Sequence, residues 1–185
     1  MQKLVILDRD GVINYDSDEF IKSSCEWQAI PGSLEAIARL KQASYRVVVA
    51  TNQSGLARGF LTLDDLHQIH KKMHKELSDL GGMIEAIFFC PHSDKDNCQC
   101  RKPRPGLFYN IAKRLGISLI EVPAVGDSLR DLQAARAAGA NPILVRTGKG
   151  ERTLSGQMTG FEDVPVYDDL AAVVDSLLDK KKIRR

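Results

Sequence analysis

The chain has 185 residues, which fits one domain with a single hydrophobic core. Hydrophobic residues make up 43% and charged residues 27%, and the net charge is +2, so the composition excludes a disordered chain and gives no reason to expect bulk attraction to nucleic acid or membranes. No apolar run approaches the roughly 20 residues that span a bilayer, and the first residues show no signal-peptide pattern, so a cytoplasmic protein is expected.

Short runs rich in Val and Ile alternate with segments of helical periodicity along the chain. The runs predict strands at residues 4–7, 47–50, 84–89, 122–125 and 143–145. The intervening segments predict helices at residues 33–43, 62–80, 105–115 and 129–138. Because such strands are joined by right-handed crossovers, the pattern predicts an α/β fold, a doubly wound and mainly parallel sheet with helices on both faces.

Three other segments carry local signals in the sequence. Residues 149–160 are rich in Gly, Ser and Thr and predict a mobile loop, and Thr62 to Asp65 is typical of a capping box at a helix start. The last residues, 180–185, are almost all Lys or Arg and predict a basic, solvated tail. We therefore expect one domain over residues 1–179 and a short tail after it.

Acidic, hydroxyl and basic side chains follow the predicted strands at their carboxyl ends. Asp8 and Asp10 come directly after the first strand, and in an open α/β sheet the functional crevice lies beyond such strand ends. The later strands are followed by a hydroxyl, a lysine and a second acid pair, namely Thr51, Lys102, and Asp127 with Asp131. Taken singly, these segments have ordinary explanations as turns, helix caps or a solvated lysine. Their occurrence in one fixed order predicts a site that handles phosphate.

The chemistry expected of this site is phosphoryl transfer with a metal ion. Four converging carboxylates cannot all stay ionised without a cation, and hard oxygen ligands with room for water favour Mg²⁺. Asp8 is the expected nucleophile, which would form an aspartyl-phosphate, and Asp10 the expected general acid and base. The Thr51 hydroxyl, Asn52 and the Lys102 ammonium group would stabilise the phosphoryl oxygens.

A cysteine-rich segment predicts a second metal site. Three thiols and one imidazole within eleven residues, in the pattern C-x-H-x5-C-x-C, suit a closed tetrahedral Zn²⁺ site formed by Cys90, His92, Cys98 and Cys100. The alternative is a set of three buried thiols beside a surface histidine. With four protein ligands the zinc would be structural, and it would stiffen the loop that carries Arg101 and Lys102.

The chain between the first two motifs is short. About 40 residues separate Asp10 from Thr51, and they must also supply a helix and a strand, so no cap domain fits and an open site is expected. Residues 14–30 show little periodicity and are either the loop that contacts the substrate or an ordinary surface connection.

The acid motifs resemble those of the haloacid-dehalogenase superfamily of phosphohydrolases. Its motifs look like DxDG, a strand-terminal Thr or Ser, a Lys, and GDxxxD, which match Asp8 to Gly11, Thr51, Lys102, and Gly126 to Asp131. The resemblance implies that Mg²⁺ is held by the Asp8 and Asp127 side chains and by the Asp10 backbone carbonyl, with Asp131 in support.

Within the capless members, the run Thr51 to Gly59 together with CPH…CxCRKPxPG resembles the D-glycero-D-manno-heptose-1,7-bisphosphate 7-phosphatases. That resemblance implies removal of the 7-phosphate during the assembly of ADP-heptose for lipopolysaccharide or related glycans. It implies substrate contacts from Asp16, Ser17, Asp18, Glu19, Asn52, Gln53, Ser54, Arg101 and Ser128. Two positions depart from the pattern, because Val12 stands where many relatives have Thr and Ser128 where some have Lys.

Four alternatives remain open from the sequence. A histidinol-phosphate phosphatase would share the acid motifs and the zinc loop, although the run Ser54 to Gly59 argues against it. A polynucleotide 3′-phosphatase would need a basic groove with stacking aromatics, and aromatic residues make up only 6%. A phospho-acceptor signalling module would carry its aspartate on a middle strand, and a zinc-dependent interaction module would leave the acid cluster unexplained. We expect a small phosphorylated sugar as the substrate, no nucleic-acid or membrane partner, and a monomer.

Overall fold

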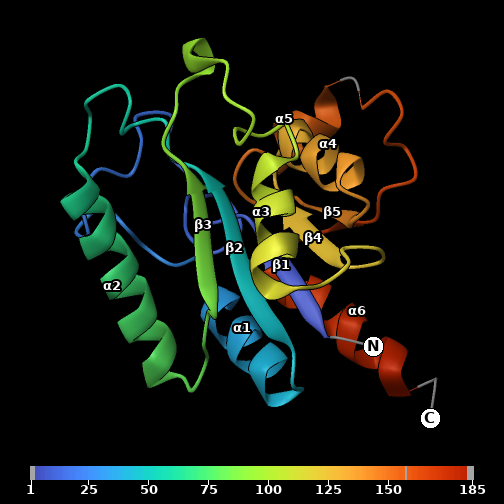
Figure 1. Ribbon diagram of the computed structural model, residues 1–185. Coiled ribbons are helices and arrows are strands. Elements are labelled where there is room, and N and C mark those ends of the chain that lie inside the picture. Colours follow the sequence, from blue (N-terminus) through green and yellow to red (C-terminus); the bar gives the residue numbers. More distant parts are fainter. Residues whose placement is uncertain (1–2, 157, 183–185) are drawn as a thin grey trace.

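A computed structural model describes residues 3–156 and 158–182 and contains one parallel sheet (Figure 1). The strands are β1 (Leu4–Leu7), β2 (Arg46–Asn52), β3 (Ala86–Cys90), β4 (Pro123–Gly126), β5 (Asn141–Val145) and β6 (Val166–Tyr167). Their order across the sheet is β3-β2-β1-β4-β5-β6 and every neighbouring pair is parallel. The chain runs outward from β1 in one direction and then from β4 in the other, so the carboxyl ends of β1 and β4 meet where the winding reverses.

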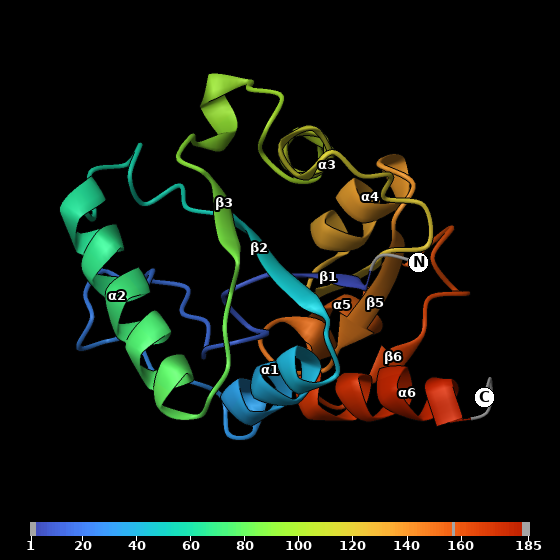
Figure 2. The ribbon, with the colours of Figure 1, turned by 60° about the horizontal axis from the view of Figure 1, so that its bottom comes forward.

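Helices cover both faces of this sheet (Figure 2). They are α1 (Ser33–Gln42), α2 (Leu63–Asp79), α3 (Gly106–Leu115), α4 (Leu129–Ala137), α5 (Gly150–Ser155) and α6 (Leu170–Lys182), with a short 3-10 turn, η1, at Asp94–Asp96. Helices α1 and α6 pack together on one face, and α3 and α4 lie on the other. The predicted doubly wound α/β fold is confirmed.

The apolar run of β1 is explained by burial on both faces. Val5 and Leu7 belong to the cluster formed with α1, α2 and α6, whereas Leu4 and Ile6 belong to the cluster formed with α3 and α4. All four side chains are buried, since successive residues of a strand point to opposite faces. A central strand with helices on both sides therefore needs an unbroken apolar sequence.

The five predicted strands and four predicted helices are present, with small shifts at their ends. The capping box at α2 is also confirmed. The Asp65 amide donates to the Thr62 hydroxyl oxygen at 3.1 Å, and the Thr62 amide donates to the Asp65 carboxylate at 2.8 Å. These two bonds satisfy backbone groups that the first turn of a helix leaves unpaired, which fixes where α2 begins.

The predicted mobile loop at 149–160 is wrong over half its length, because Gly150–Ser155 forms α5. The Thr153 hydroxyl donates to the Asp127 carbonyl at 2.9 Å, which ties α5 to the end of β4. Gly150 passes so close to the Val145 carbonyl that an added Cβ would lie 1.9 Å from its oxygen. These are tertiary contacts, and a Gly- and Thr-rich sequence does not reveal them.

The carboxyl-terminal part holds two elements without a sequence prediction, β6 and α6. Helix α6 includes residues 180–182 of the predicted basic tail, and residues 183–185 lie outside the described part of the chain. Within residues 3–156 and 158–182, no helix combines the length and the apolar character needed to cross a bilayer.

Candidate active site

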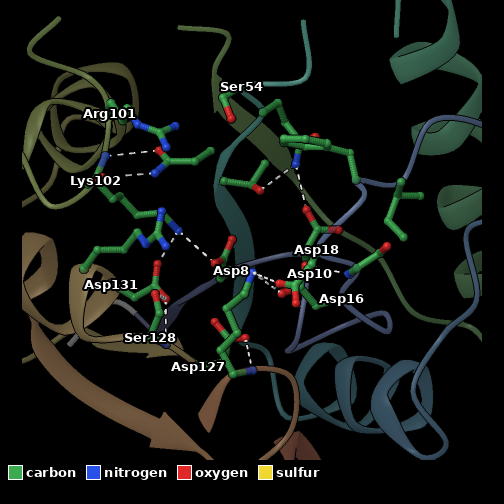
Figure 3. A pocket seen from close by; sticks show the side chains of 18 of the residues that line it. Asp8, Asp10, Asp16, Asp18, Ser54, Arg101, Lys102, Asp127, Ser128 and Asp131 are labelled. Atoms are coloured by element: carbon green, nitrogen blue, oxygen red, sulfur yellow. Dashed lines mark hydrogen bonds and ion pairs between the residues drawn. The ribbon is translucent and has the colours of Figure 1, made fainter. Parts of the chain in front are cut away.

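A pocket of about 230 Å³ lies at the carboxyl ends of β1, β2 and β4 (Figure 3). The loops that follow these strands, together with the loops that follow β3 and β5, bring the acidic and basic residues together at one edge of the sheet, as the topology requires. Eighteen of the side chains that line it are drawn in Figure 3, where Lys102 and Asp131 lie on one side of Asp8, and Asp16 and Asp18 on the other. The residues predicted from four separate sequence segments therefore share one cavity.

A buried lysine joins two carboxylates at the floor of the pocket. The Lys102 ammonium nitrogen lies 3.0 Å from Asp8 Oδ2 and 2.6 Å from Asp131 Oδ1, and it donates to the Ala50 carbonyl at 2.8 Å. Only 2% of Lys102 is exposed. Burial disfavours the charged form of Lys102, but the two carboxylates outweigh burial and raise its pKa. Lys102 is therefore a fixed cation beside Asp8.

Asp8 itself is held in one orientation. Its Oδ1 accepts a hydrogen bond from the Arg9 backbone amide at 2.7 Å, while Oδ2 faces Lys102. Burial, together with the charges of Asp131 and Asp10, raises the pKa of Asp8 to about 7 in spite of Lys102. The negative charge on this carboxylate is thus only partly compensated by the protein.

Asp127 supplies further uncompensated negative charge. One carboxylate oxygen from each of Asp8, Asp127 and Asp131 lies within 4.8 Å of the others. Burial and the charges of Asp131 and Asp8 raise the pKa of Asp127 to about 8. Three converging oxygen ligands that repel one another fit a hard divalent cation such as Mg²⁺.

Two loops are shaped around the Asp127 carboxylate. Its Oδ2 accepts a hydrogen bond from the Lys149 backbone amide at 2.7 Å. A Cβ on Gly11 would lie 2.0 Å from the same oxygen, and a Cβ on Gly148 would lie 2.2 Å from it. Gly11 and Gly148 have φ of 82° and 58°, a backbone conformation that side-chain-bearing residues rarely adopt. Glycine at both positions lets the backbone approach Asp127 this closely.

Both oxygens of the Asp10 carboxylate accept hydrogen bonds from neighbouring side chains. Arg9 donates to both of its oxygens at 3.0 Å, Asn14 Nδ2 donates to Oδ1 at 2.8 Å, and Gln53 Nε2 donates to Oδ2 at 2.9 Å. Burial would raise the pKa of Asp10, but the Arg9 charge and these hydrogen bonds outweigh burial and lower it. Asp10 is therefore ionised at neutral pH in this arrangement.

Arg9 is itself fixed from the opposite side. It is fully buried, its Nη2 donates to Gln53 Oε1 at 3.1 Å, and its Nη1 lies 3.3 Å from His70 Nε2. A guanidinium can only donate, so His70 Nε2 accepts and the ring is neutral. Burial and the nearby Arg9 charge lower the pKa of His70 to about 3, in agreement with a neutral ring. Neither Arg9 nor His70 was predicted from the sequence, because neither has a motif and His70 reaches the site only through the packing of α2.

The end of β2 supplies the predicted hydroxyl and amides. The Thr51 hydroxyl is almost fully buried and accepts from Gln53 Nε2 at 3.0 Å. Asn52 pairs with the Lys102 backbone in both directions, since its Nδ2 donates to the Lys102 carbonyl and its Oδ1 accepts from the Lys102 amide, each at 3.1 Å. The amide pair attaches the loop carrying Lys102 to the end of β2.

The Cys and His residues of the predicted zinc loop come together beside the pocket. Cys90 Sγ lies 3.6 Å from Cys98 Sγ and 3.2 Å from Cys100 Sγ, and His92 Nδ1 lies 3.3 Å from Cys100 Sγ. All three thiols are free. Zn–S bonds of about 2.3 Å in a tetrahedron place two sulfurs about 3.8 Å apart, so the cluster fits zinc with a small expansion.

The zinc loop also positions Arg101 and Lys102. Arg101 Nη1 donates to the His92 carbonyl at 3.3 Å, and both Arg101 and Lys102 line the pocket. The four side chains can therefore hold a metal, and none of them lines the pocket. Any change in the cluster would be transmitted to the two cations that follow Cys100.

The structure brings nearly all of the predicted site residues to the pocket. Those that line it are Asp8, Asp10, Asp16, Ser17, Asp18, Thr51, Asn52, Gln53, Ser54, Arg101, Lys102, Asp127, Ser128 and Asp131. Ser128 is also the N-cap of α4 and donates its backbone amide to Asp131 at 3.0 Å. Glu19 is the exception. It is exposed to solvent and does not line the pocket, because the turn after Ser17 directs it outward.

Five lining residues were not predicted, namely Phe20, Ile21, Arg58, Arg130 and Lys149. The three cations have no motif of their own. Arg58 stands inside the run from Thr51 to Gly59, which was the only available signal for it, whereas Lys149 lay within the segment predicted to be a loop.

Comparisons with known proteins agree with this geometry. The family model described as polynucleotide kinase 3 phosphatase matches residues 3–129, and the HAD-hydrolase-like model matches residues 99–177. The D-glycero-beta-D-manno-heptose-1,7-bisphosphate 7-phosphatase of Bordetella bronchiseptica is 58% identical over 178 residues, which cover 96% of this chain and 99% of the relative. The chain belongs to the heptose-1,7-bisphosphate 7-phosphatase family of HAD-like hydrolases.

A second relative and two solved structures are also similar to this chain. The Pseudomonas aeruginosa enzyme of the same name is 50% identical over 96% of this chain and 98% of its own. The crystal structure of the B. bronchiseptica heptose bisphosphate phosphatase, complexed with magnesium and phosphate, superposes with a TM-score of 0.94 at 57% identity and covers 97% of this chain and 99% of that chain. The structure from Burkholderia thailandensis has a TM-score of 0.76 at 47% identity, with 96% and 99% covered. As a member of this family the chain is a phosphatase, which confirms the prediction of a phosphoric monoester hydrolase.

Proposed function

We propose that this enzyme removes the 7-phosphate of D-glycero-β-D-manno-heptose 1,7-bisphosphate through an aspartyl-phosphate on Asp8. The proposed substrate rests on the 58% identity, over 96% of this chain, to a relative named as the phosphatase of this compound. The pocket supports the chemistry, because it offers a nucleophile, a fixed cation and a second carboxylate at one point. The product would enter the assembly of ADP-heptose for lipopolysaccharide.

In the first half-reaction an Asp8 oxygen attacks phosphorus and the bond from phosphorus to the sugar oxygen breaks. The buried Lys102 stabilises the charge that builds on the phosphoryl oxygens, together with the Thr51 hydroxyl and Asn52. The departing alkoxide takes a proton from Asp10. Because hydrogen-bond donors keep Asp10 ionised in the absence of substrate, the carboxyl must take up this proton from solvent as the anionic substrate binds.

In the second half-reaction water hydrolyses the aspartyl-phosphate. The Asp10 carboxylate accepts a proton from water, the water oxygen attacks phosphorus, and the bond from phosphorus to Asp8 breaks. Arg9 and Gln53 hold Asp10 in one orientation for this step. Inorganic phosphate then leaves and Asp8 is regenerated.

Two metals complete the proposal. Asp8, Asp127 and the Asp10 carbonyl would hold Mg²⁺ with Asp131 in support, and the bound ion neutralises phosphate charge so that a carboxylate can approach. Cys90, His92, Cys98 and Cys100 would hold a structural Zn²⁺ that fixes the loop before Arg101.

The remaining predicted contacts concern the sugar and the distal phosphate. Asp16, Ser17, Asp18, Gln53 and Ser54 are the proposed contacts on the loop side of the pocket. Arg101 and Ser128 are proposed on the Lys102 side. We also propose that the enzyme acts as a monomer with one domain over residues 1–179, which light scattering after gel filtration tests.

The decisive experiment compares Mg²⁺-dependent phosphate release from four substrates. They are the β- and α-anomers of heptose 1,7-bisphosphate, histidinol phosphate and an oligonucleotide with a 3′-phosphate. We expect kcat/KM for the β-anomer to exceed the others, and no turnover for any substrate with Asp8→Asn. Preference for histidinol phosphate or the oligonucleotide would retain the mechanism and overturn the proposed substrate, whereas turnover by Asp8→Asn would overturn the mechanism.

A further inference from the structure

The wall of the pocket opposite Lys102 is formed by a short acidic loop. Asp16 and Asp18 both line the pocket and lie on the same side of Asp8 in Figure 3. Asp16 is the more enclosed of the two, with 17% of its side chain exposed against 65% for Asp18. An acidic wall is unexpected in a pocket for an anionic substrate. Some cation must therefore keep Asp16 in place.

Lys149 is that cation. Its ammonium nitrogen lies 2.6 Å from Asp16 Oδ2, while Asp16 Oδ1 accepts a hydrogen bond from the Ser17 amide at 2.8 Å. Both oxygens of Asp16 are thus fixed, one by its own loop and one by the β5–α5 connection. Burial disfavours the charged form of Lys149, but its hydrogen bond to Asp16 and the surrounding acids outweigh burial and raise its pKa.

The backbone of Lys149 is anchored independently of its side chain. Its amide donates to Asp127 Oδ2 at 2.7 Å, and the Thr147 hydroxyl donates to the Gly11 carbonyl at 2.6 Å. The β5–α5 connection is therefore attached to the acid cluster, and from there the Lys149 side chain reaches the loop that carries Asp16. One residue joins the reacting centre to the wall that faces the sugar.

We propose that Lys149 is a positioning residue for substrate selection, whose ammonium group holds the Asp16 carboxylate in the pocket wall where Asp16 accepts hydrogen bonds from sugar hydroxyls. The proposal rests on the proposed function, since it requires a polyhydroxylated phosphate ester as substrate. Without Lys149, repulsion from the substrate phosphates would drive Asp16 out of the pocket.

Two further ion pairs on the same loop, both with Asp18, are expected to matter less. Arg152 Nη2 lies 3.1 Å from Asp18 Oδ2 and Lys149 Nζ lies 3.7 Å from Asp18 Oδ1, but the Asp18 side chain is 65% exposed. Exposed pairs contribute little because water and salt screen them. The more enclosed pair between Lys149 and Asp16 is therefore the one that determines where the carboxylate of the pocket wall lies.

The test uses Lys149→Met, which keeps the approximate side-chain length and the backbone amide but removes the charge. With heptose bisphosphate we expect KM to rise about 10-fold, the equivalent of one lost charge-assisted hydrogen bond, while kcat changes less than about 3-fold. With p-nitrophenyl phosphate, which has no sugar hydroxyls, kcat/KM should stay within about 2-fold of wild type. Lys149→Arg should recover most of the lost affinity.

The matched control is Arg146→Met, on the same connection. Arg146 pairs with Glu151 at 3.0 Å and with Asp168 at 3.3 Å, and it does not line the pocket. Arg146→Met should therefore leave the KM and kcat for both substrates unchanged. If Lys149 acts through Asp16, the double variant Lys149→Met/Asp16→Asn should have the KM of Asp16→Asn alone.

Three results would overturn the proposal. They are an unchanged KM in Lys149→Met, an equal loss with p-nitrophenyl phosphate, and a KM in the double variant that is the product of the two single effects. Thermal unfolding of each variant separates these results from loss of the fold. If wild type itself shows no preference for heptose bisphosphate, the proposed function fails, whereas a wild-type preference that persists in Lys149→Met refutes only the role of Lys149.

Discussion

Substitution of Gly11 by alanine tests whether the turn after Asp10 is built around Asp127. An alanine Cβ at this position would lie 2.0 Å from Asp127 Oδ2 and 2.6 Å from its carboxyl carbon. Asp127 cannot move aside freely, since it is 3% exposed and accepts a hydrogen bond from the Lys149 amide at 2.7 Å. The residue would also keep a φ of 82°, which disfavours any side chain.

The two costs can be separated with a second glycine. A left-handed backbone costs alanine about 1–2 kcal/mol, and forcing an extra carbon into a packed site costs about 1–3 kcal/mol. Gly11→Ala should therefore lower the free energy of unfolding by about 2–5 kcal/mol, which a protein with a stability of about 5–15 kcal/mol survives. Gly59 has a φ of 72°, and a Cβ added there would meet no described atom within 4 Å, so Gly59→Ala should show only the backbone cost.

The assay is urea unfolding of both variants beside Mg²⁺-dependent phosphate release. We expect Gly59→Ala to retain activity and Gly11→Ala to lose about 100-fold or more in kcat, because a displacement of about 1 Å at a reacting centre has this effect. Equal destabilisation of the two variants, or a Gly11→Ala enzyme with normal kcat, would refute the packing of Gly11 against Asp127.

Three further predictions concern the charges and metals of the site. Lys102→Met should abolish turnover and lower the free energy of unfolding by about 3–5 kcal/mol in urea titrations, because it leaves Asp8 and Asp131 buried without their cation. Mg²⁺ affinity, measured by calorimetry, should rise as pH increases through the range from about 6 to about 8, since the raised pKa values of Asp8, about 7, and Asp127, about 8, mean that protons compete with the metal. Protein prepared without chelator should contain about one equivalent of zinc, and Cys98→Ser should lose both the zinc and most of the activity.

A control variant and a further pH measurement accompany these predictions. Lys113→Met, on the exposed side of α3, should change neither stability nor activity. For the metal-free protein, raised pKa values mean that the folded state holds more protons than the unfolded state, so stability should fall as pH rises from about 4 to about 8. A pH-independent Mg²⁺ affinity, or zinc below about half an equivalent, would contradict the two metal predictions.

The fold could be predicted from the sequence wherever burial or capping requires particular residue types at neighbouring positions. Leu4 to Leu7 are apolar without interruption because both faces of β1 are covered, and Thr62 with Asp65 specifies the start of α2 within four residues. Helix α5 could not be predicted in this way. It has only six residues, and contacts such as that of Thr153 with the Asp127 carbonyl stabilise it across the fold.

The site residues also fall into those that could be predicted from a local pattern and those that could not. Asp8, Asp10, Thr51 and Asp127 could be predicted from the sequence by itself, because each lies at or soon after the end of a strand and parallel strands bring their carboxyl ends to one edge. Lys102 lies well beyond the end of β3, and it could be predicted because it follows the Cys-rich segment that begins at that strand end. The Cys and His residues of the predicted zinc loop were equally evident, since all four lie within eleven residues.

Only the tertiary structure decided which side chains support these groups. His70 reaches Arg9 from α2, 61 positions further along the chain, and Lys149 reaches Asp16 from the connection between β5 and α5. Neither contact has a local pattern, because a single ion pair or hydrogen bond between distant segments constrains one residue at each end and leaves the residues around it free. The chemistry of the reacting groups is therefore determined locally by the sequence, whereas their orientation and the shape of the pocket wall depend on how the helices and connections pack.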